Sequence, residues 1–280
     1  MRTLFFGTSA FAVPSLRAVA ARTSLAGVVT RPDRPAGRGQ RLTPSPVKTE
    51  ALALGARVYE PTKLRPFALE LAPERFDLFV LASYGRVLPV ELLELPRCGA
   101  LNVHPSLLPK YRGATPIQTA IANGETETGV SIMLMDAGLD TGDVVQQRRV
   151  EIEPGETYGA LHDRLALVGA ELLARTLDLL SRGQLDPKPQ IGEASLTRPL
   201  SKEDLAIDWS WSPKQIVDRV RAFSPQPAAR ATIEGETIKI LRAHVDADGA
   251  LVLDELVAPN RGKTTGAEYR AFRRARADSK

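Results

Sequence analysis

Two polar side chains that could take part in proton transfer lie two residues apart in an apolar segment. Asn102 and His104 alternate with aliphatic residues, which is the pattern of a strand, so both side chains leave the strand on the same face. Histidine has an unperturbed pKa near neutrality and suits proton transfer. The asparagine amide can donate a hydrogen bond to an oxygen that becomes charged. The structural alternative is that Asn102 caps the strand and His104 is a satisfied loop residue.

The segment after this strand is interrupted by residues that break regular structure. They are Pro105, Pro109, Gly113 and Pro116. The apolar pair Leu107 and Leu108 lies between the first two prolines. A loop with this composition suits the wall of a pocket better than a flexible connection. We therefore expect it to line a binding site next to the polar pair.

A second segment offers a carboxylate. Asp136 and Asp140 lie close to Gly138 and Gly142 after another apolar run, which is the composition of a tight turn. One carboxylate can orient and stabilise an imidazolium, and either aspartate could do so for His104. The alternative is a turn with no chemical role. No part of the sequence has His, Cys and carboxylate residues at metal-ligand spacing, so no metal is expected.

The elements that must position these residues alternate strands and helices through the first half of the chain. Apolar runs predict strands at Leu4–Phe6, Ala26–Thr30, Leu78–Ser83, Ala100–Val103 and Val130–Met135. Helical patterns lie at Pro14–Ala21, Val47–Leu54 and Thr115–Asn123. This alternation predicts an α/β fold with a layered sheet. Ligands of such sheets bind at the carboxyl ends of the strands, where Asn102 and His104 lie.

The second half of the chain has a different organisation. A long amphipathic helix is predicted over residues 157–182, ending at Arg182-Gly183. The proline-bearing segment that follows predicts an extended linker. One helix and three strands then predict a small β-rich domain: Pro213–Ala222, Ala231–Ile233, Thr237–Ala243 and Ala250–Leu256. The expected organisation is residues 1–183, a linker over residues 184–206, and a second domain over residues 207–280.

The composition is that of an ordinary globular protein, with 43% apolar and 25% charged residues. No apolar run approaches the roughly 20 residues of a membrane helix, so no membrane partner is expected. A single cysteine, Cys98, excludes an internal disulfide and favours the cytoplasm. Only Gly7 of the pattern G-x-G-x-x-G follows the first strand, so a nicotinamide dinucleotide is not expected. The sequence also lacks a Walker loop and the G-x-S-x-G motif of serine hydrolases.

The net charge of +4 is unevenly distributed. Residues 261–280 hold seven Lys and Arg against two acids, a net +5, so residues 1–260 sum to −1. Residues 31–41 hold four arginines against one acid, a net +3. The arginines are Arg31, Arg34, Arg38 and Arg41. Two basic regions on a near-neutral chain indicate local contacts with phosphate, and solvated basic segments are the alternative.

Two sequence runs resemble the 10-formyltetrahydrofolate-dependent formyltransferases. They are NVHPSLLPKYRGATPIQ at residues 102–118 and GLDTGD at residues 138–143. The resemblance implies a Rossmann-like domain with a mostly parallel sheet, followed by a small OB-like β-barrel, and formyl transfer to an amine without a metal. It implies that the catalytic residues are Asn102, His104 and Asp140. The implied folate-binding residues are Tyr84, Gly85, Arg86, Leu88, Ser106, Leu107, Leu108, Pro109 and Asp136.

Residues 30–48 resemble a loop of those family members whose acceptor is the initiator methionyl-tRNA. The implied tRNA contacts are Arg34, Arg38 and Arg41. Residues 207–210 and 219–225 resemble the junction into the second domain of the same members. The implied function is formylation of this tRNA for translation initiation, by a cytoplasmic monomer. Fewer residues remain after Asp208 than the family's barrel contains, so we expect a shortened barrel.

Three other functions share part of this pattern. A sugar-nucleotide N-formyltransferase would have the same catalytic residues but would not need the basic segment at residues 31–48. A non-catalytic nucleic-acid-binding protein would interleave aromatic and basic side chains, whereas residues 226–280 have only Tyr269 and Phe272 as aromatics. A regulator that binds folate without turnover would not need the intact catalytic residues.

Overall fold

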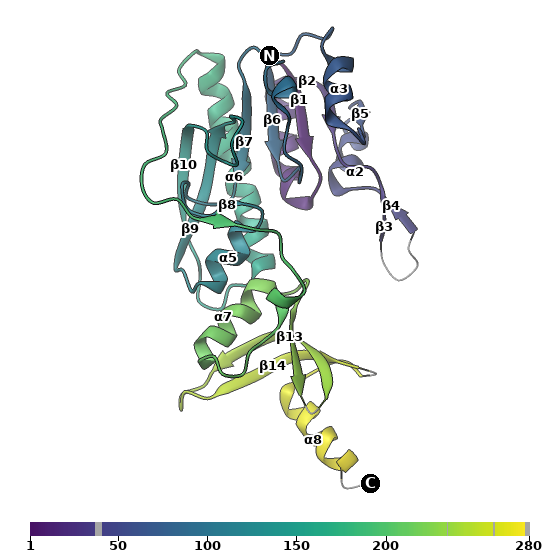
Figure 1. Cartoon of the computed structure of the whole chain (residues 1–280), viewed down its shortest axis with the longest axis vertical. Coiled ribbons are helices and arrows are strands. Elements are labelled where there is room, and N and C mark those ends of the chain that lie inside the picture. Colours follow the sequence, from purple (N-terminus) through teal and green to yellow (C-terminus); the bar gives the residue numbers. More distant parts are fainter. Residues whose placement is uncertain (37–40, 234, 260, 278–280) are drawn as a thin grey trace. The chain divides into compact units, whose positions relative to one another are not determined.

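The computed structural model describes residues 1–36, 41–233, 235–259 and 261–277 (Figure 1). Contacts along and across the chain divide it into two compact units, each assembled from separate stretches of sequence. The first unit comprises residues 1–114, 129–150 and 163–196. The second comprises residues 115–128, 151–162 and 197–280. The sequence-based division at residues 183 and 206 stays a prediction.

A seven-stranded sheet forms the centre of the first unit, in the order β10-β9-β7-β6-β1-β2-β5 (Figure 1). The strands are β1 (Arg2–Gly7), β2 (Ser24–Val29), β5 (Val58–Tyr59), β6 (Leu78–Ala82), β7 (Ala100–His104), β9 (Glu127–Leu134) and β10 (Val144–Glu151). The pairs β1–β2, β1–β6, β2–β5 and β6–β7 are parallel, and β9 runs antiparallel to β7. The mostly parallel α/β sheet that the sequence predicts is therefore confirmed.

Helices accompany this sheet. They are α1 (Val13–Arg22), α2 (Pro46–Ala53), α3 (Leu64–Leu71), α4 (Val90–Leu93) and α6 (Tyr158–Ser181), with the 3-10 turn η1 at Ala10–Ala12. Residues of α6 from Asp163 onward belong to the first unit. A Cβ atom at Gly169 of α6 would lie 2.8 Å from Val103 Cγ1 of β7. The missing side chain therefore lets α6 pack directly against the strand that carries Asn102 and His104.

Aromatic side chains form much of the core of the first unit. Phe6, Phe76 and Phe79 are fully buried, and the ring centroids of Phe6 and Phe79 are 5.1 Å apart. All five residues of β6 are buried, as the loss of alternation in its sequence predicts. Burial of each such side chain contributes roughly 1.5–3 kcal/mol, before the entropy of ordering is subtracted. The sheet is therefore a firm support for the loops that leave its edges.

The second unit contains a four-stranded antiparallel sheet. Its strands are β12 (Ala229–Ile233), β13 (Glu236–Val245), β14 (Leu251–Ala258) and β15 (Gly262–Thr264). A short turn joins β13 to β14, in which Asp246 Oδ1 accepts hydrogen bonds from the amides of Asp248 and Ala250. The small β-rich second domain is confirmed.

Helices and short elements complete the chain. The second unit contains α5 (Pro116–Ala122), α7 (Pro213–Phe223), α8 (Gly266–Ala277) and the 3-10 turn η2 at Glu203–Leu205. Two further two-stranded sheets are formed by β3 (Arg34–Ala36) with β4 (Arg41–Thr43), and by β8 (Arg112–Gly113) with β11 (Leu196–Thr197). A capping box begins α7, with Ser212 Oγ accepting from the Gln215 amide and the Gln215 side chain accepting from the Ser212 amide.

Candidate active site

The polar pair lies on β7, between a parallel and an antiparallel neighbour. Asn102 is paired with Leu81 of β6 and Met133 of β9, and His104 is the last residue of β7. Asn102 is half-buried, while His104 is only 4% exposed. The parallel alignment of β6 and β7 places His104 at the carboxyl edge of the sheet, where ligands of this fold class bind.

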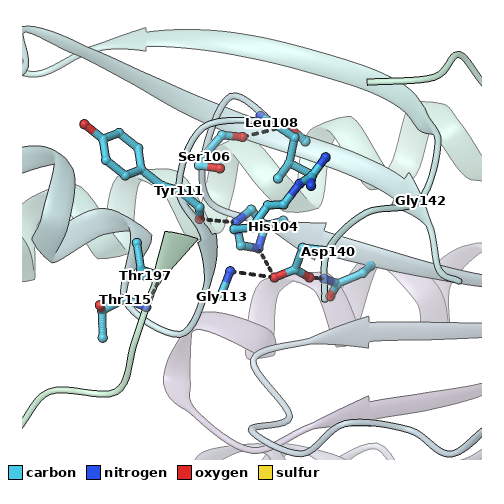
Figure 2. A network of polar contacts seen from close by, with 12 residues as sticks. His104, Ser106, Leu108, Tyr111, Gly113, Thr115, Asp140, Gly142 and Thr197 are labelled. Carbon is cyan, nitrogen blue, oxygen red and sulfur yellow. Dashed lines mark hydrogen bonds and ion pairs between the residues drawn. The ribbon is translucent and has the colours of Figure 1, made fainter. Parts of the chain in front are cut away.

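Asp140 completes a cluster with these two residues, and Figure 2 shows its carboxylate beside the ring of His104. Its Oδ2 atom lies 3.6 Å from His104 Nδ1, and its Oδ1 atom lies 3.3 Å from Asn102 Nδ2. Oδ2 also accepts a hydrogen bond of 2.8 Å from the amide of Gly113. The structure thus brings together all three predicted catalytic residues, two from strand β7 and one from the turn that follows β9.

The second candidate carboxylate has a different environment. Asp136 is exposed and accepts hydrogen bonds from Thr141 Oγ1 at 2.7 Å and from the Gly138 amide at 3.0 Å. These bonds close the turn on itself. Asp140, and not Asp136, is therefore the carboxylate beside His104.

The imidazole ring of His104 is fixed between two oxygen atoms. Nε2 lies 2.9 Å from the carbonyl oxygen of Tyr111, which can only accept, so Nε2 carries a proton and donates it. Nδ1 faces Asp140 at a separation longer than a direct hydrogen bond. Tyr111 and Asp140 both have positive φ, 59° and 51°, in the left-handed region that residues with a side chain rarely adopt. Unusual backbone at both partners of one histidine is typical of a functional site.

The turn that carries Asp140 folds tightly against the end of β9. A Cβ atom at Gly142 would lie 1.8 Å from the carbonyl oxygen of Leu134, a distance that no side chain can occupy. The Leu134 amide also donates to the carbonyl oxygen of Asp143 at 2.9 Å. Gly142 is thus required for the turn to close and to return Asp140 toward β7.

The hydroxyl group of Ser131 holds the loop of residues 106–109 through hydrogen bonds to its backbone. Ser131 of β9 donates to the carbonyl oxygen of Ser106 at 2.6 Å and accepts from the Leu108 amide at 3.2 Å. Gln147 Nε2 donates both to Ser131 Oγ at 2.9 Å and to the Leu108 carbonyl oxygen at 2.7 Å. Ser106 is itself fully buried, and its hydroxyl donates to the Lys110 carbonyl oxygen at 2.6 Å. The predicted folate-binding loop is therefore rigidly supported.

Replacing Ser131 by Ala should destabilise the chain and displace this loop. The buried Leu108 amide and Ser106 carbonyl would lose their shared partner, so the free energy of unfolding should fall by about 1–3 kcal/mol. The KM for the folate donor should rise because residues 106–109 are predicted to bind it. Urea denaturation and steady-state kinetics measure the two effects. Ser24→Ala, at an exposed serine of β2, is the matched control; equal effects of both variants would contradict the support by Ser131.

The predicted segment Tyr84–Leu88 follows the carboxyl end of β6. Tyr84 and Leu88 are buried, and burial raises the pKa of the Tyr84 phenol, which the guanidinium of Arg86 opposes. Arg86 donates to the carbonyl oxygens of Pro61 and Thr62 at 2.8 and 3.1 Å. An open cleft of about 630 Å³ adjoins this segment. It is lined by Lys63, Leu64, Arg65, Pro66, Arg86, Val87 and Pro89.

The basic segment forms the β3–β4 hairpin (Figure 1). Arg34 is exposed on β3, Arg41 begins β4, and Arg38 lies outside the described residues. An ion cluster holds the base of the hairpin: Lys48 Nζ lies 2.8 Å from Glu60 Oε2 and 2.9 Å from Asp33 Oδ1. The hydrogen bonds that Lys48 donates to Glu60 and, to a lesser extent, to Asp33 raise its pKa. The hairpin is therefore anchored where it leaves the sheet.

Sequence patterns did not indicate three residues that support the site: Ser131, Gln147 and Gln190. Ser131 is the single polar residue of the predicted strand Val130–Met135, which is a weak signal of a buried hydrogen bond. Gln147 lies in a polar run, and Gln190 lies in the predicted linker, so neither had a distinguishing pattern. Within the described part of the chain, no cluster of three His, Cys, Asp or Glu residues could hold a metal ion. The helices described there are all too short or too polar to cross a membrane.

Comparisons with known proteins show the family to which the chain belongs. A formyl transferase family model matches residues 1–177, and a model of the formyl transferase C-terminal domain matches residues 199–264. The chain therefore belongs to the formyl transferase family. The N-formyltransferase of Helicobacter canadensis, solved in complex with folinic acid and dTDP-3-aminofucose, has the same fold. It superposes with a TM-score of 0.69 at 20% identity, covering 92% of this chain and 95% of its own.

Sequence relatives are more closely similar. The methionyl-tRNA formyltransferase of Xanthomonas euvesicatoria pv. vesicatoria is 49% identical over 245 residues, which is 86% of this chain and 80% of the relative. The methionyl-tRNA formyltransferase of Pelotomaculum thermopropionicum is 46% identical over 248 residues, which is 88% of this chain and 79% of the relative. Identity at this level over most of both chains places the relationship within the family, and not only within the fold.

Proposed function

We propose that this chain transfers a formyl group from 10-formyltetrahydrofolate to the amino group of methionyl initiator tRNA, in support of translation initiation. The observation that carries the proposal is the cluster of Asn102, His104 and Asp140 at the edge of the sheet. It occurs in a chain that is 46–49% identical to methionyl-tRNA formyltransferases. We propose that the enzyme works as a monomer in the cytoplasm.

The cluster has the groups that formyl transfer requires. The acceptor nitrogen forms a bond to the formyl carbon, and the carbonyl oxygen becomes an oxyanion. Asn102 Nδ2 has two protons, one of which points to Asp140, so the other can donate to that oxygen. The bond from the formyl carbon to the folate nitrogen then breaks. His104 moves the proton lost by the amine toward that nitrogen, and Asp140 stabilises the imidazolium that forms on the way.

The donor site combines two loops of the first unit. The apolar side chains of Leu107, Leu108 and Leu88 would contact the rings of the folate, and Asp136 would lie at their polar edge. A folate also carries a glutamyl group with two carboxylates. The cleft beside Arg86 has the opposite charge, because Lys63 and Arg65 line it as well. Attraction between these groups would orient the donor with its glutamyl end in the cleft.

The basic hairpin supplies the acceptor contacts in this proposal. Arginine side chains on a loop suit the phosphates of an RNA backbone, which position the molecule without reading its sequence. The ion cluster of Lys48 with Asp33 and Glu60 fixes the base of the hairpin. Arg34, Arg38 and Arg41 would then meet the acceptor arm of the tRNA from a defined place.

Replacing Arg38 by Ala should lower kcat/KM for methionyl-tRNA and reduce its dependence on salt. Loss of one phosphate contact should reduce the slope of log(kcat/KM) against log salt by about one. Rates measured between low and physiological ionic strength test this. Arg182→Ala, at an exposed position at the end of α6, is the matched control. An Arg38→Ala variant with the wild-type rate at every salt concentration would remove the hairpin from the tRNA site.

The proposed function is tested by formyl transfer with competing acceptors. The full chain is incubated with 10-formyltetrahydrofolate and methionyl-tRNA, with a dTDP-amino sugar in excess as the second acceptor. We expect formylmethionyl-tRNA and no formylated sugar. Transfer to the sugar alone would show a sugar-nucleotide N-formyltransferase. Folate binding without transfer to either acceptor would overturn the proposal.

A further inference from the structure

The chain continues within the first unit after the end of α6. Residues 184–196 belong to this unit by their contacts, although their sequence predicts an extended linker. Lys188 exchanges two backbone hydrogen bonds with Val144, at 2.8 and 2.9 Å. The two family models end at residue 177 and begin again at residue 199, so the segment lies between them.

Gln190 of this segment binds the turn that carries Asp140. Its Nε2 atom donates to the carbonyl oxygens of Asp140 and Gly142, both at 2.8 Å. Its Oε1 atom accepts from Arg112 Nε at 3.1 Å and from Arg112 Nη2 at 2.7 Å. The nitrogen and the oxygen of this half-buried amide therefore both form hydrogen bonds. One side chain thus binds the two carbonyl groups on either side of Thr141.

This contact has a consequence for the carboxylate of Asp140. The residue has φ of 51°, a conformation that residues with a side chain adopt infrequently and that costs free energy unless the surroundings support it. In that conformation its carboxylate reaches Asn102, the Gly113 amide and His104. Without Gln190, two backbone carbonyl groups of the turn would lose their partner, and the conformation would lose much of its support.

The same segment also binds the second partner of His104. Ser195 Oγ accepts from the Tyr111 amide at 2.8 Å, and its carbonyl oxygen accepts from the Arg112 amide at 2.9 Å. The carbonyl oxygen of Tyr111 in turn accepts from His104 Nε2. Residues 188–195 thus hold both groups between which the imidazole ring lies.

We propose that residues 188–195 form a positioning element of the active site, in which Gln190 sets the place of the Asp140 carboxylate. Gln190 is a positioning residue, since it acts on the reaction through Asp140 and Arg112. This inference rests on the proposed function, because it requires that Asp140 takes part in formyl transfer. Residues 188–195 would then position catalytic groups in addition to connecting two parts of the chain.

Replacing Gln190 by Leu tests the proposal by kinetics. The kcat for formyl transfer should fall roughly ten- to a hundredfold, because a small displacement of a catalytic group has effects of this size. The KM values for folate and methionyl-tRNA should change less than about twofold, since Gln190 binds neither. Gln184→Leu, at an exposed glutamine of the same segment, should have the wild-type kcat and serves as the control. A normal kcat in Gln190→Leu would overturn the proposal.

A double-mutant cycle separates positioning from a merely structural role. In an Asp140→Asn background, Gln190→Leu should lower kcat by less than about twofold, since the group that it positions is already inactive. Fully additive losses would show that Gln190 does not act through Asp140. If Gln190→Leu does not fold, Gln190→Glu takes its place, because it keeps the acceptor for Arg112 and removes both donors to the turn.

A spectroscopic readout distinguishes this inference from the proposed function. The amide proton of Gly113 donates to Asp140 Oδ2, so its chemical shift reports the position of the carboxylate. We expect this resonance to shift in Gln190→Leu, in the direction seen for Asp140→Ala, while it stays in place in Gln184→Leu. An unmoved resonance would overturn the inference even if formyl transfer is confirmed. A moved resonance in a chain without transferase activity would leave the positioning intact and reject the proposed function.

Discussion

An Asp140→Asn variant should transfer formyl groups roughly 10² to 10⁴ times more slowly than the wild-type chain, with nearly unchanged affinity for folate. The asparagine has the same shape and can still accept from the Gly113 amide, whose nitrogen lies 2.8 Å from Oδ2. It has no negative charge, so it cannot stabilise an imidazolium at His104. General acid–base catalysis is worth a factor of this size, and it depends on that protonation state.

Single-turnover rates with both substrates saturating measure the chemical step for this variant. A separate titration with folate shows whether the donor still binds. Asp143→Asn is the matched control, since Asp143 is an exposed aspartate of the same turn. Equal rates for Asp140→Asn and the wild type would remove Asp140 from the catalytic group and leave Asn102 and His104 to act without it.

Removing the side chain of Asp218 should lower the free energy of unfolding of the second unit by about 3–5 kcal/mol. Asp218 lies on α7 with its side chain 7% exposed, and its Oδ1 atom is 2.6 Å from Arg221 Nη2. The Arg221 side chain is 14% exposed and also donates to the carbonyl oxygen of Glu156 at 3.1 Å. An Asp218→Ala variant would leave this cation in a largely buried place without its counter-charge.

Lys214 provides the control for this prediction. It also contacts Asp218, at 2.6 Å, but its side chain is 72% exposed. An ion pair with a lysine that is exposed to solvent is worth only about 0–1 kcal/mol, so Lys214→Ala should have a small effect. Urea denaturation followed by circular dichroism compares the two variants. Losses of similar size would show that the burial of Arg221 adds nothing to the stability of α7.

The sequence predicted those elements whose apolar pattern is produced by burial. β1, β6, β7 and β9 lie inside the sheet, and their predicted bounds agree with the structure to within a few residues. β10 was not predicted, because it lies at the edge of the sheet and carries the polar run of residues 146–149. Edge strands face solvent on one side, so their sequences lack the signal on which the prediction depends.

Helices with weak or charged patterns were also missed. α3 contains Pro66 near its start, which is allowed there but interrupts the pattern of a helix. The composition of residues 261–280 predicts only a basic segment, whereas Tyr269 of α8 is 2% exposed and its hydroxyl donates to Glu236 Oε2 at 3.1 Å. The charged residues of α8 dominate its composition, but one buried aromatic side chain fixes the helix. Such a contact between residues distant in sequence leaves no local signal.

In the candidate site, too, some residues could be predicted from the sequence and others could not. Asn102 and His104 could be singled out by their spacing on a strand, and a family resemblance selected Asp140 as the catalytic carboxylate. The residues alone could not decide between Asp136 and Asp140, because both lie in one glycine-rich turn. The backbone decides it: Asp140 has positive φ and points to His104, while Asp136 bonds to Thr141. The choice depends on the path of the chain and not on composition.

The ion cluster at the base of the basic hairpin implies that salt weakens the binding of phosphate by the hairpin more than it disturbs the conformation at this base. Exposed arginines lose their attraction for phosphate as the screening length falls to about 10 Å at 0.1 M salt. Lys48 is only 19% exposed and touches Asp33 and Glu60 at less than 3 Å, so its contacts are screened far less. In the proposed complex, rising ionic strength should therefore shorten the residence of tRNA on the hairpin, while the base of the hairpin keeps its conformation. A tRNA that binds as proposed would then meet a hairpin whose base is already held in place by these ion pairs.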